Sequence, residues 1–242
     1  MTSPARVWRA HVDAVEVCFV GRGGPVERDL AIRRAADRHL PVAWLEQRHS
    51  AVCVEAAGGC CGEGDALWTA EPELALCVAT ADCVPVALAG ARGVAMIHAG
   101  WRGIVAGVVG RAARAVETRS PGARAWIGPA VGVCCYEVGG DVAAEVEAAS
   151  GPGVVVAGNG QRPHLDLAAA VEYQLRGMGV ASVERLGPCT RCSPDLLHSY
   201  RRDGAGAGRN LSYVWLRRAP ARSRRSDGSV TLPARFTSPR SG

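Results

Sequence analysis

The sequence contains no lysine, few aromatic residues and no long uninterrupted hydrophobic run. All 28 basic residues are arginine, and Phe, Trp and Tyr make up 5% of the 242 residues, so a core must be built mostly from Val, Leu and Ala. The longest apolar run, residues 74–89, is interrupted by Asp82 and Pro85 and is too short to span a bilayer. No apolar stretch typical of a signal peptide follows the first six residues. We therefore expect a cytoplasmic protein without a membrane partner.

The composition is that of a folded globular protein with a basic C-terminal end. Hydrophobic residues account for 48% and charged residues for 21%, which excludes disorder along the whole chain. Residues 217–242 hold seven arginines and one aspartate, so their net charge exceeds the net charge of +5 of the whole chain. The rest of the chain is therefore near neutral. We predict one domain over residues 1–216 and a disordered basic tail over 217–242, through which nucleic acid would bind only weakly. The oligomeric state is left open.

The hydrophobic pattern alternates between strand and helix periods, which predicts an α/β (α+β) fold. We expect strands over residues 15–20, 51–56, 74–80, 84–89, 94–99, 126–127, 183–186 and 211–216. The connections between the central strands are too short for crossover helices, which favours antiparallel pairing. We expect helices over residues 26–40, 104–119, 141–149 and 166–178. The sequence predicts a single layered domain with a mixed, largely antiparallel β-sheet flanked by helices.

Ten cysteines need an explanation other than export, because disulfides are rare in the cytosol. Cys18 and Cys77 lie in apolar stretches and are expected in the core. The adjacent pairs Cys60-Cys61 and Cys134-Cys135 suit neither a strain-free disulfide nor a tetrahedral metal clamp. Cys189-Thr190-Arg191-Cys192 is a C-x-x-C motif, but no second C-x-x-C or histidine pair follows it, so a zinc ribbon is not predicted there.

Three residues are candidate metal ligands: His49, Cys83 and His98. Their separations are too long for a local metal knuckle but suit three strand ends that converge at one sheet edge. Two imidazoles and one thiolate would form a zinc site with an open fourth position, where a bound water could have a pKa of about 7. The spacing alone favours the alternative, in which a surface histidine, a core cysteine and a histidine near a helix share no function.

Charged residues around these candidates suggest an anion site. Residues 100–103, Gly-Trp-Arg-Gly, lead into the strongest predicted helix, where free N–H groups and the Arg102 guanidinium could bind an anion. Alternatively, Arg102 pairs with a carboxylate and Trp101 fills the core. Asp82 is costly within an apolar run unless it has a partner, and could be a structural acceptor or a general acid/base. Residues 198–209 place several arginines beside a Gly-rich loop, a weak signal for an oxyanion ligand.

Together, these segments resemble the laccase-domain (polyphenol oxidase-like) purine nucleoside phosphorylase family, which includes the bacterial peptidoglycan editing factor. The resemblance covers residues 15–216 and is most specific in residues 80–83, Thr-Ala-Asp-Cys, and 98–103, His-Ala-Gly-Trp-Arg-Gly. Further matches are Arg22-Gly23-Gly24, Gln47 with His49, Gly64-Asp65-Ala66-Leu67, Ile127-Gly128-Pro129, Cys135-Tyr136-Glu137-Val138, Asp166-Leu167, Cys189-Thr190, and Ser199-Tyr200-Arg201-Arg202-Asp203 with Gly208-Arg209.

The resemblance implies zinc bound by His49, Cys83 and His98. It also implies cleavage of purine nucleosides (adenosine, inosine, guanosine and methylthioadenosine) by phosphate, and deamination of adenosine. Catalytic roles are expected for Asp65, Asp82, Cys83 and Arg102. Nucleoside or phosphate binding is expected for Arg22, Gln47, Trp101, Arg102, Arg202 and Arg209. Ser50, Arg48 and His198 depart from the usual family pattern, and the segment between Gly24 and Leu40 is short, so one wall of the pocket can differ.

Three other functions remain open. A cysteine or zinc hydrolase acting on amino-acid-linked peptidoglycan precursors would use Cys83 as a nucleophile. A copper polyphenol oxidase is less favoured, because the sequence has no His-x-His pairs of the multicopper type. A non-enzymatic, metal-stabilised module would bind through the basic tail.

Overall fold

Two six-stranded β-sheets packed face to face form the centre of the structure. The computed structural model describes residues 6–23, 27–158, 160 and 162–218. The first sheet comprises, in spatial order, β1 (Val7–Val12), β2 (Val15–Val20), β14 (Asn210–Leu216), β7 (Ala75–Thr80), β3 (Val42–Glu46) and β5 (Gly59–Glu63). The second comprises β13 (Ser182–Arg185), β10 (Arg124–Ile127), β8 (Val84–Gly90), β9 (Gly93–Ala99), β6 (Ala66–Thr69) and β4 (Cys53–Glu55).

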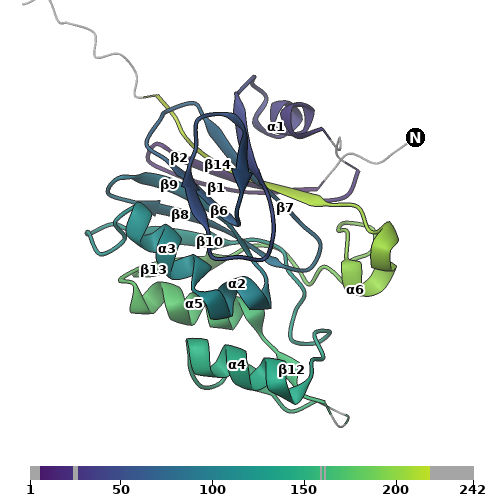
Figure 1. The fold of residues 1–242 in the computed structure, drawn as a ribbon. Helices are drawn as coiled ribbons and strands as arrows, with labels where there is room; N and C mark the ends of the chain where they lie inside the picture. Colours follow the sequence, from purple (N-terminus) through teal and green to yellow (C-terminus); the bar gives the residue numbers. More distant parts are fainter. Residues whose placement is uncertain (1–5, 24–26, 159, 161, 219–242) are drawn as a thin grey trace, which may run out of the picture.

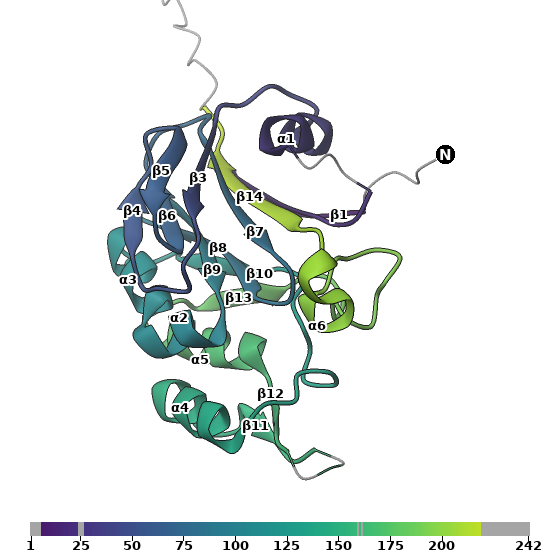
Figure 2. The same cartoon turned by 45° about the vertical axis from the view of Figure 1, so that its right-hand side comes forward.

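Helices cover the two outer faces, which gives four layers (Figures 1 and 2). The first sheet is covered by α1 (Arg28–Ala36), whose Ile32 is buried with Cys18 and Tyr213. The second sheet is covered by α2 (Trp101–Ala106), α3 (Val108–Ala115) and α5 (Leu167–Gly177), and α4 (Gly140–Ser150) packs against α2 and α5 on the side away from the sheet. A short α6 (Tyr200–Asp203), a 3₁₀ turn (Gly204–Gly206) and the pair β11 (Val155–Val156) and β12 (His164–Leu165) complete the described elements.

The core lies between the sheets and beneath the helices, as the apolar runs require. Phe19, Leu76 and Met96 are buried in the inter-sheet layer. β8 and β9 are buried on both faces because the first sheet covers one side and α3 the other, which explains why they read as continuous apolar runs. Their antiparallel pairing is confirmed, and it aligns Pro85 with His98.

The predicted α/β fold class is confirmed, but the strands divide into two sheets rather than one. Antiparallel pairs outnumber parallel ones, the latter including β3 with β7 and β10 with β13. The sequence did not reveal β1, β3, β5 or β6. These strands are short or half-exposed, so their apolar pattern is weak and long-range pairing fixes them.

Two predicted helices differ from the observed ones. The helix expected over 104–119 is two helices, α2 and α3, because Gly107 lies between them with φ 86°. The helix expected over 26–40 contains α1, which ends where Asp37 adopts φ 54°. Within the part of the chain that the structure describes, no helix has both the length and the apolar character needed to cross a membrane.

The end of β14 at Leu216 coincides with the predicted end of the domain. Arg217 still hydrogen-bonds the carbonyl of Ala14, at 2.7 Å. The remainder of the tail predicted over 217–242 lies outside the described residues, from 219 onward. Its predicted disorder stays a prediction.

Candidate metal centre and cavity

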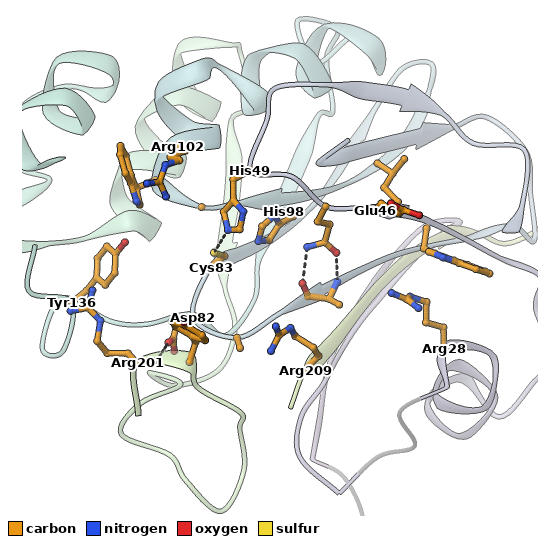
Figure 3. Close-up of a pocket in the computed structure, with 18 residues that line it drawn as sticks. Arg28, Glu46, His49, Asp82, Cys83, His98, Arg102, Tyr136, Arg201 and Arg209 are labelled. Carbon is orange, nitrogen blue, oxygen red and sulfur yellow. Dashed lines mark hydrogen bonds between the residues drawn. The ribbon is translucent and has the colours of Figure 1, made fainter. Parts of the chain in front are cut away.

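The three predicted ligands come together where the two sheets meet. His49 lies in the loop after β3, Cys83 immediately precedes β8, and His98 lies near the end of β9. Their donor atoms all lie within 4.8 Å of one another, and Cys83 Sγ is 3.8 Å from His49 Nε2. Figure 3 shows the three side chains converging at the centre of a cavity.

Gly100 makes room for this group. A Cβ added there would lie 2.9 Å from the His49 ring and 3.1 Å from Cys83 Sγ, so a larger residue would displace both. Two imidazoles and one thiolate at this spacing are a donor set that zinc accepts. The three residues therefore fit a single divalent ion with one side left toward the cavity.

Asp65 holds two of the candidate ligands in place. Its fully buried carboxylate is 2.8 Å from His98 Nδ1 and accepts the backbone N–H groups of Arg48, His49 and Ser50. This cluster of donors accounts for the left-handed backbone of His49, at φ 58°. The bond to Nδ1 fixes the His98 ring and leaves its Nε2 for a metal. The Ser50 hydroxyl, which departs from the family pattern, adds a further bond to Asp65.

The environment favours the charged forms of the centre. Burial alone would raise the pKa of Cys83, but hydrogen bonds from His49 and His98 lower it to about 6. Burial alone would lower the pKa of His98, but Asp65 and Cys83 raise it to about 9. Burial alone would raise the pKa of Asp65, but His98 and Ser50 hold it well below its usual range. At neutral pH the metal-free centre is therefore a thiolate, an imidazolium and a carboxylate in contact.

The cavity around the centre has a volume of about 650 Å³, within the usual range for small-molecule sites. Its described lining contains four arginines (Arg28, Arg102, Arg201 and Arg209), two acidic residues (Glu46 and Asp82) and the aromatic residues Trp44, Trp101, Tyr136 and Tyr200. In Figure 3, Tyr136 and Arg201 lie at one end and Arg28 and Glu46 at the other. The excess of arginine over acid favours an anionic ligand, and the aromatic faces favour a planar one.

Asp82 joins the metal centre to the far wall of the cavity. Its carboxylate accepts the Thr190 hydroxyl and the Arg201 backbone N–H, each at 2.5 Å. Its own backbone is left-handed, at φ 91°. These bonds provide the partners that a carboxylate in an apolar run requires, so the geometry matches the structural-acceptor alternative from the sequence.

Four other residues with predicted roles, Trp101, Arg102, Arg209 and Gln47, line the cavity and differ in the contacts that their side chains make. The Arg102 guanidinium lies over the Trp101 ring, 4.4 Å from its centroid. Arg209 uses Nη1 for the carbonyls of Ala207 and Gly208, which leaves its other N–H groups for a ligand. Gln47 exchanges two 2.8 Å hydrogen bonds with the backbone of Ala79 and so holds β7 to the loop after β3.

The structure does not bring Arg22 and Arg202 into the cavity lining. Arg202 donates to the carbonyls of Thr190, Arg191 and Leu197 and to the Asp203 carboxylate. Arg22 pairs with Asp203 at 3.3 Å. Asp65 is likewise absent from the lining, because it lies buried behind His98. The substrate-binding roles predicted for the two arginines, and the proton-transfer role predicted for Asp65, have no support from these positions.

Sequence reasoning missed several lining residues. Tyr136 and Arg201 both lie in matched family segments but received no role, and Arg201 stacks over the Tyr136 ring at 4.8 Å. Arg28 lies over Trp44 at 5.2 Å. Nothing in the local sequence indicates that α1 and β3 face the same cavity as residues 98–102, because that proximity depends on how the sheets stack.

A second group of possible metal ligands lies outside the cavity lining. Cys134, Cys135, Cys189 and Cys192 have donor atoms within 4.8 Å of one another. The sequence-based expectation that the adjacent pair and the C-x-x-C motif are poor metal ligands considered each motif alone. The fold brings the two motifs together, which neither motif indicates by itself.

Comparison with known proteins gives a consistent family. Residues 26–217 match the model of the multi-copper polyphenol oxidoreductase laccase family. A Streptomyces coelicolor protein named purine nucleoside phosphorylase is 44% identical over 198 residues, covering 78% of this chain and 81% of that protein. A Pseudomonas aeruginosa protein of the same name is 36% identical over 181 residues, covering 72% and 74%.

A solved structure has the same fold. The crystal structure of a Neisseria meningitidis protein superposes with a TM-score of 0.76 at 30% identity, covering 88% of this chain and 99% of that one. The family match spans far more than half of the sequence and includes all three candidate ligands. The chain therefore belongs to the multi-copper polyphenol oxidoreductase laccase family.

Proposed function

We propose that this protein is a zinc-dependent purine nucleoside phosphorylase, which converts a purine nucleoside and phosphate to the free base and ribose 1-phosphate. The observation that carries the proposal is a two-histidine, one-cysteine centre that opens into a cavity rich in arginine and aromatic side chains. The names of the Streptomyces and Pseudomonas relatives support the same activity. The substrates are a small-molecule nucleoside and phosphate.

In phosphorolysis a phosphate oxygen bonds to C1′ of the ribose while the bond from C1′ to the base nitrogen breaks. The base leaves with that electron pair and takes up a proton. When bound, zinc would supply a positive charge able to hold an anionic oxygen or acidify a water. His49, Cys83 and His98 would hold the ion, while Asp65 orients His98.

Arg102 and Arg209 are the proposed phosphate-binding residues. Each lines the cavity, and each presents a planar set of N–H donors that matches phosphate oxygens. Trp101 supports the Arg102 guanidinium from below its plane. Burial raises the pKa of Tyr136 to about 12, so its hydroxyl keeps its proton at neutral pH and can donate a hydrogen bond to the base or the ribose.

The decisive assay is release of free base from inosine or adenosine with and without phosphate. We expect base release that requires phosphate and zinc and falls at least about 100-fold in Cys83→Ser and His49→Ala. Arg102→Gln should raise the KM for phosphate, whereas Arg111→Gln, an exposed arginine on α3, should not. No base release by the zinc-loaded protein would contradict the proposal. Formation of inosine from adenosine without phosphate would identify the deaminase activity.

A cysteine hydrolase is the second candidate, because Cys83 is a low-pKa thiol beside two histidines. It predicts that zinc removal leaves hydrolysis of amino-acid-linked peptidoglycan precursors intact and that alkylation of metal-free protein abolishes it. Phosphorolysis predicts the opposite response to zinc removal. The two functions are therefore separated by one chelation experiment.

A further inference from the structure

We propose that Cys134, Cys135, Cys189 and Cys192 bind one structural zinc ion, separate from the centre in the cavity. The four sulfur atoms lie within 4.8 Å of one another, although residues 135 and 189 are far apart in the chain. Structural zinc sites have four protein ligands, whereas catalytic sites have three and an open position. The four converging thiols therefore indicate a structural site, in contrast to the three-donor centre in the cavity.

The fold explains why the two cysteine pairs meet. β10 and β13 are parallel neighbours, with Arg124 opposite Ser182 and Ile127 opposite Arg185. The segments that follow two parallel neighbours leave from the same sheet edge. Residues 134–135 and 189–192 lie in those segments, and Thr190 N–H bonds the Ala130 carbonyl at 2.9 Å. The parallel pairing of β10 and β13 in the second sheet thus brings the four thiols together.

The spacing fits one ion. Cys134 Sγ and Cys135 Sγ lie 3.7 Å and 3.2 Å from Cys192 Sγ. A tetrahedral zinc with four Zn–S bonds of about 2.3 Å places its sulfur atoms about 3.8 Å apart. An iron–sulfur cluster holds its thiolates farther apart, because they bind different iron atoms at different corners.

The backbone at Gly132 accommodates the cysteine cluster. The Gly132 N–H points at Cys189 Sγ at 3.2 Å. A Cβ on Gly132 would crowd Cys134 Sγ and the Cys189 side chain, each at 3.3 Å, so glycine permits the approach.

The site would brace one wall of the cavity. Cys135 is adjacent to Tyr136, which lines the cavity, and Cys189 is adjacent to Thr190, which donates to Asp82. The ion would therefore act as a local staple without contacting the substrate.

The test is the metal content of the full-length protein purified without chelator, measured by mass spectrometry. We expect two zinc ions per chain in the wild type, one in Cys189→Ser/Cys192→Ser, and one in Cys83→Ser. The matched control, Cys60→Ser/Cys61→Ser, changes an adjacent cysteine pair on β5 and should keep both ions. If the double variant at 189 and 192 holds as much zinc as the wild type, the proposal is wrong. If only Cys83→Ser loses zinc, the proposed four-cysteine site is also wrong, and the assignment of zinc to the cavity centre still stands.

A second measurement does not depend on whether the double variant folds. Cobalt added to metal-depleted Cys83→Ser protein should give the intense charge-transfer and tetrahedral bands of a four-thiolate site. Absence of these bands would contradict the proposal. A thiol titration under denaturing, chelating conditions should find all the remaining cysteines free, and two missing thiols would instead identify a disulfide between the pairs.

Discussion

At the scale of single residues, Asp65 determines how the candidate centre is oriented. It is fully buried and accepts hydrogen bonds from His98 and from the turn that carries His49. An outer carboxylate of this kind fixes the tautomer and direction of a metal-binding histidine. Asp65 is therefore proposed as a positioning residue, and the ligands alone do not define the site.

Replacing Asp65 with Asn should weaken zinc binding and destabilise the protein. Both carboxylate oxygens of Asp65 accept hydrogen bonds, and in asparagine an NH₂ group would replace one of these oxygens and face the same donors. We therefore expect a loss of about 3 kcal/mol in the free energy of unfolding. Zinc affinity should fall about 10- to 100-fold. Excess zinc should restore much of kcat, because Asp65 does not line the cavity. Glu55→Gln, an exposed acid on β4, should change neither quantity. Unchanged zinc affinity, measured by competition with a chelating dye, would contradict the positioning role.

Cys83 should be reactive as a thiolate in chelator-treated protein. Its pKa is lowered to about 6, so the thiolate dominates above pH 6 and is lost as the pH falls through that value. The alkylation rate of the Cys83 peptide, followed by mass spectrometry, should be half-maximal near pH 6, whereas free cysteine reaches this point near pH 8.5. His49→Ala should move the midpoint upward. Zinc should protect Cys83, and a midpoint above pH 8 in the wild type would disprove the assignment.

At the scale of elements, Gly107 divides the strongest predicted helix. The apolar spacing continues through residues 104–116, so sequence periodicity alone cannot reveal the break. The left-handed backbone at Gly107 redirects the chain between α2 and α3. Only a residue without Cβ adopts this backbone at low cost.

Gly107→Ala and Gly110→Ala should have opposite effects on stability. At Gly107 a Cβ meets no neighbour but forces a non-glycine residue into φ 86°, so we expect a loss of about 1 kcal/mol. Gly110 lies within α3, where a Cβ would meet only the end of Arg114, so alanine should add about 0.5–1 kcal/mol. Urea unfolding of the two variants provides the comparison. Equal effects would show that the break at Gly107 does not depend on its backbone conformation.

The elements also show why the site was only partly predictable. His49, Cys83 and His98 could be singled out because they are metal-ligating residue types near apolar runs and lie in segments that resemble the family. The four-cysteine group could not, since it depends on the parallel pairing of β10 with β13. Arg22 and Arg202 carry the charge of a phosphate site, but their hydrogen bonds to Asp203 and to carbonyl groups become visible only after folding.

At the scale of the whole molecule, β14 is the last strand of the described residues and an inner strand of the first sheet. It lies between β2 and β7 in the first sheet and contributes the buried Tyr213 and Val214. The sequence indicated this closing strand correctly, because its apolar run is followed directly by arginines. The division of strands between two sheets was not predictable, since local patterns do not specify distant partners.

Deleting residues 219–242 should leave the folded unit intact. We expect an unchanged melting temperature, zinc content and phosphorolysis, because β14 ends at Leu216 and the three candidate ligands lie between residues 49 and 98. Deleting residues 210–242 should prevent folding, since this removes a strand from the middle of a sheet. Circular dichroism and metal analysis of both truncations test this. Lower stability after the shorter deletion would refute the predicted boundary, and salt-dependent nucleic-acid binding lost with the tail would favour the binding-module alternative.

The origin of the three ligands has a mechanical consequence. His49 follows β3 of the first sheet, whereas Cys83 precedes β8 and His98 lies in β9, both of the second sheet. An ion held by all three would cross-link the two sheets at the edge where the cavity opens. Any displacement of one sheet relative to the other would then distort the coordination geometry of the ion. The relative motion of the two sheets and the reactivity of the centre would therefore be coupled.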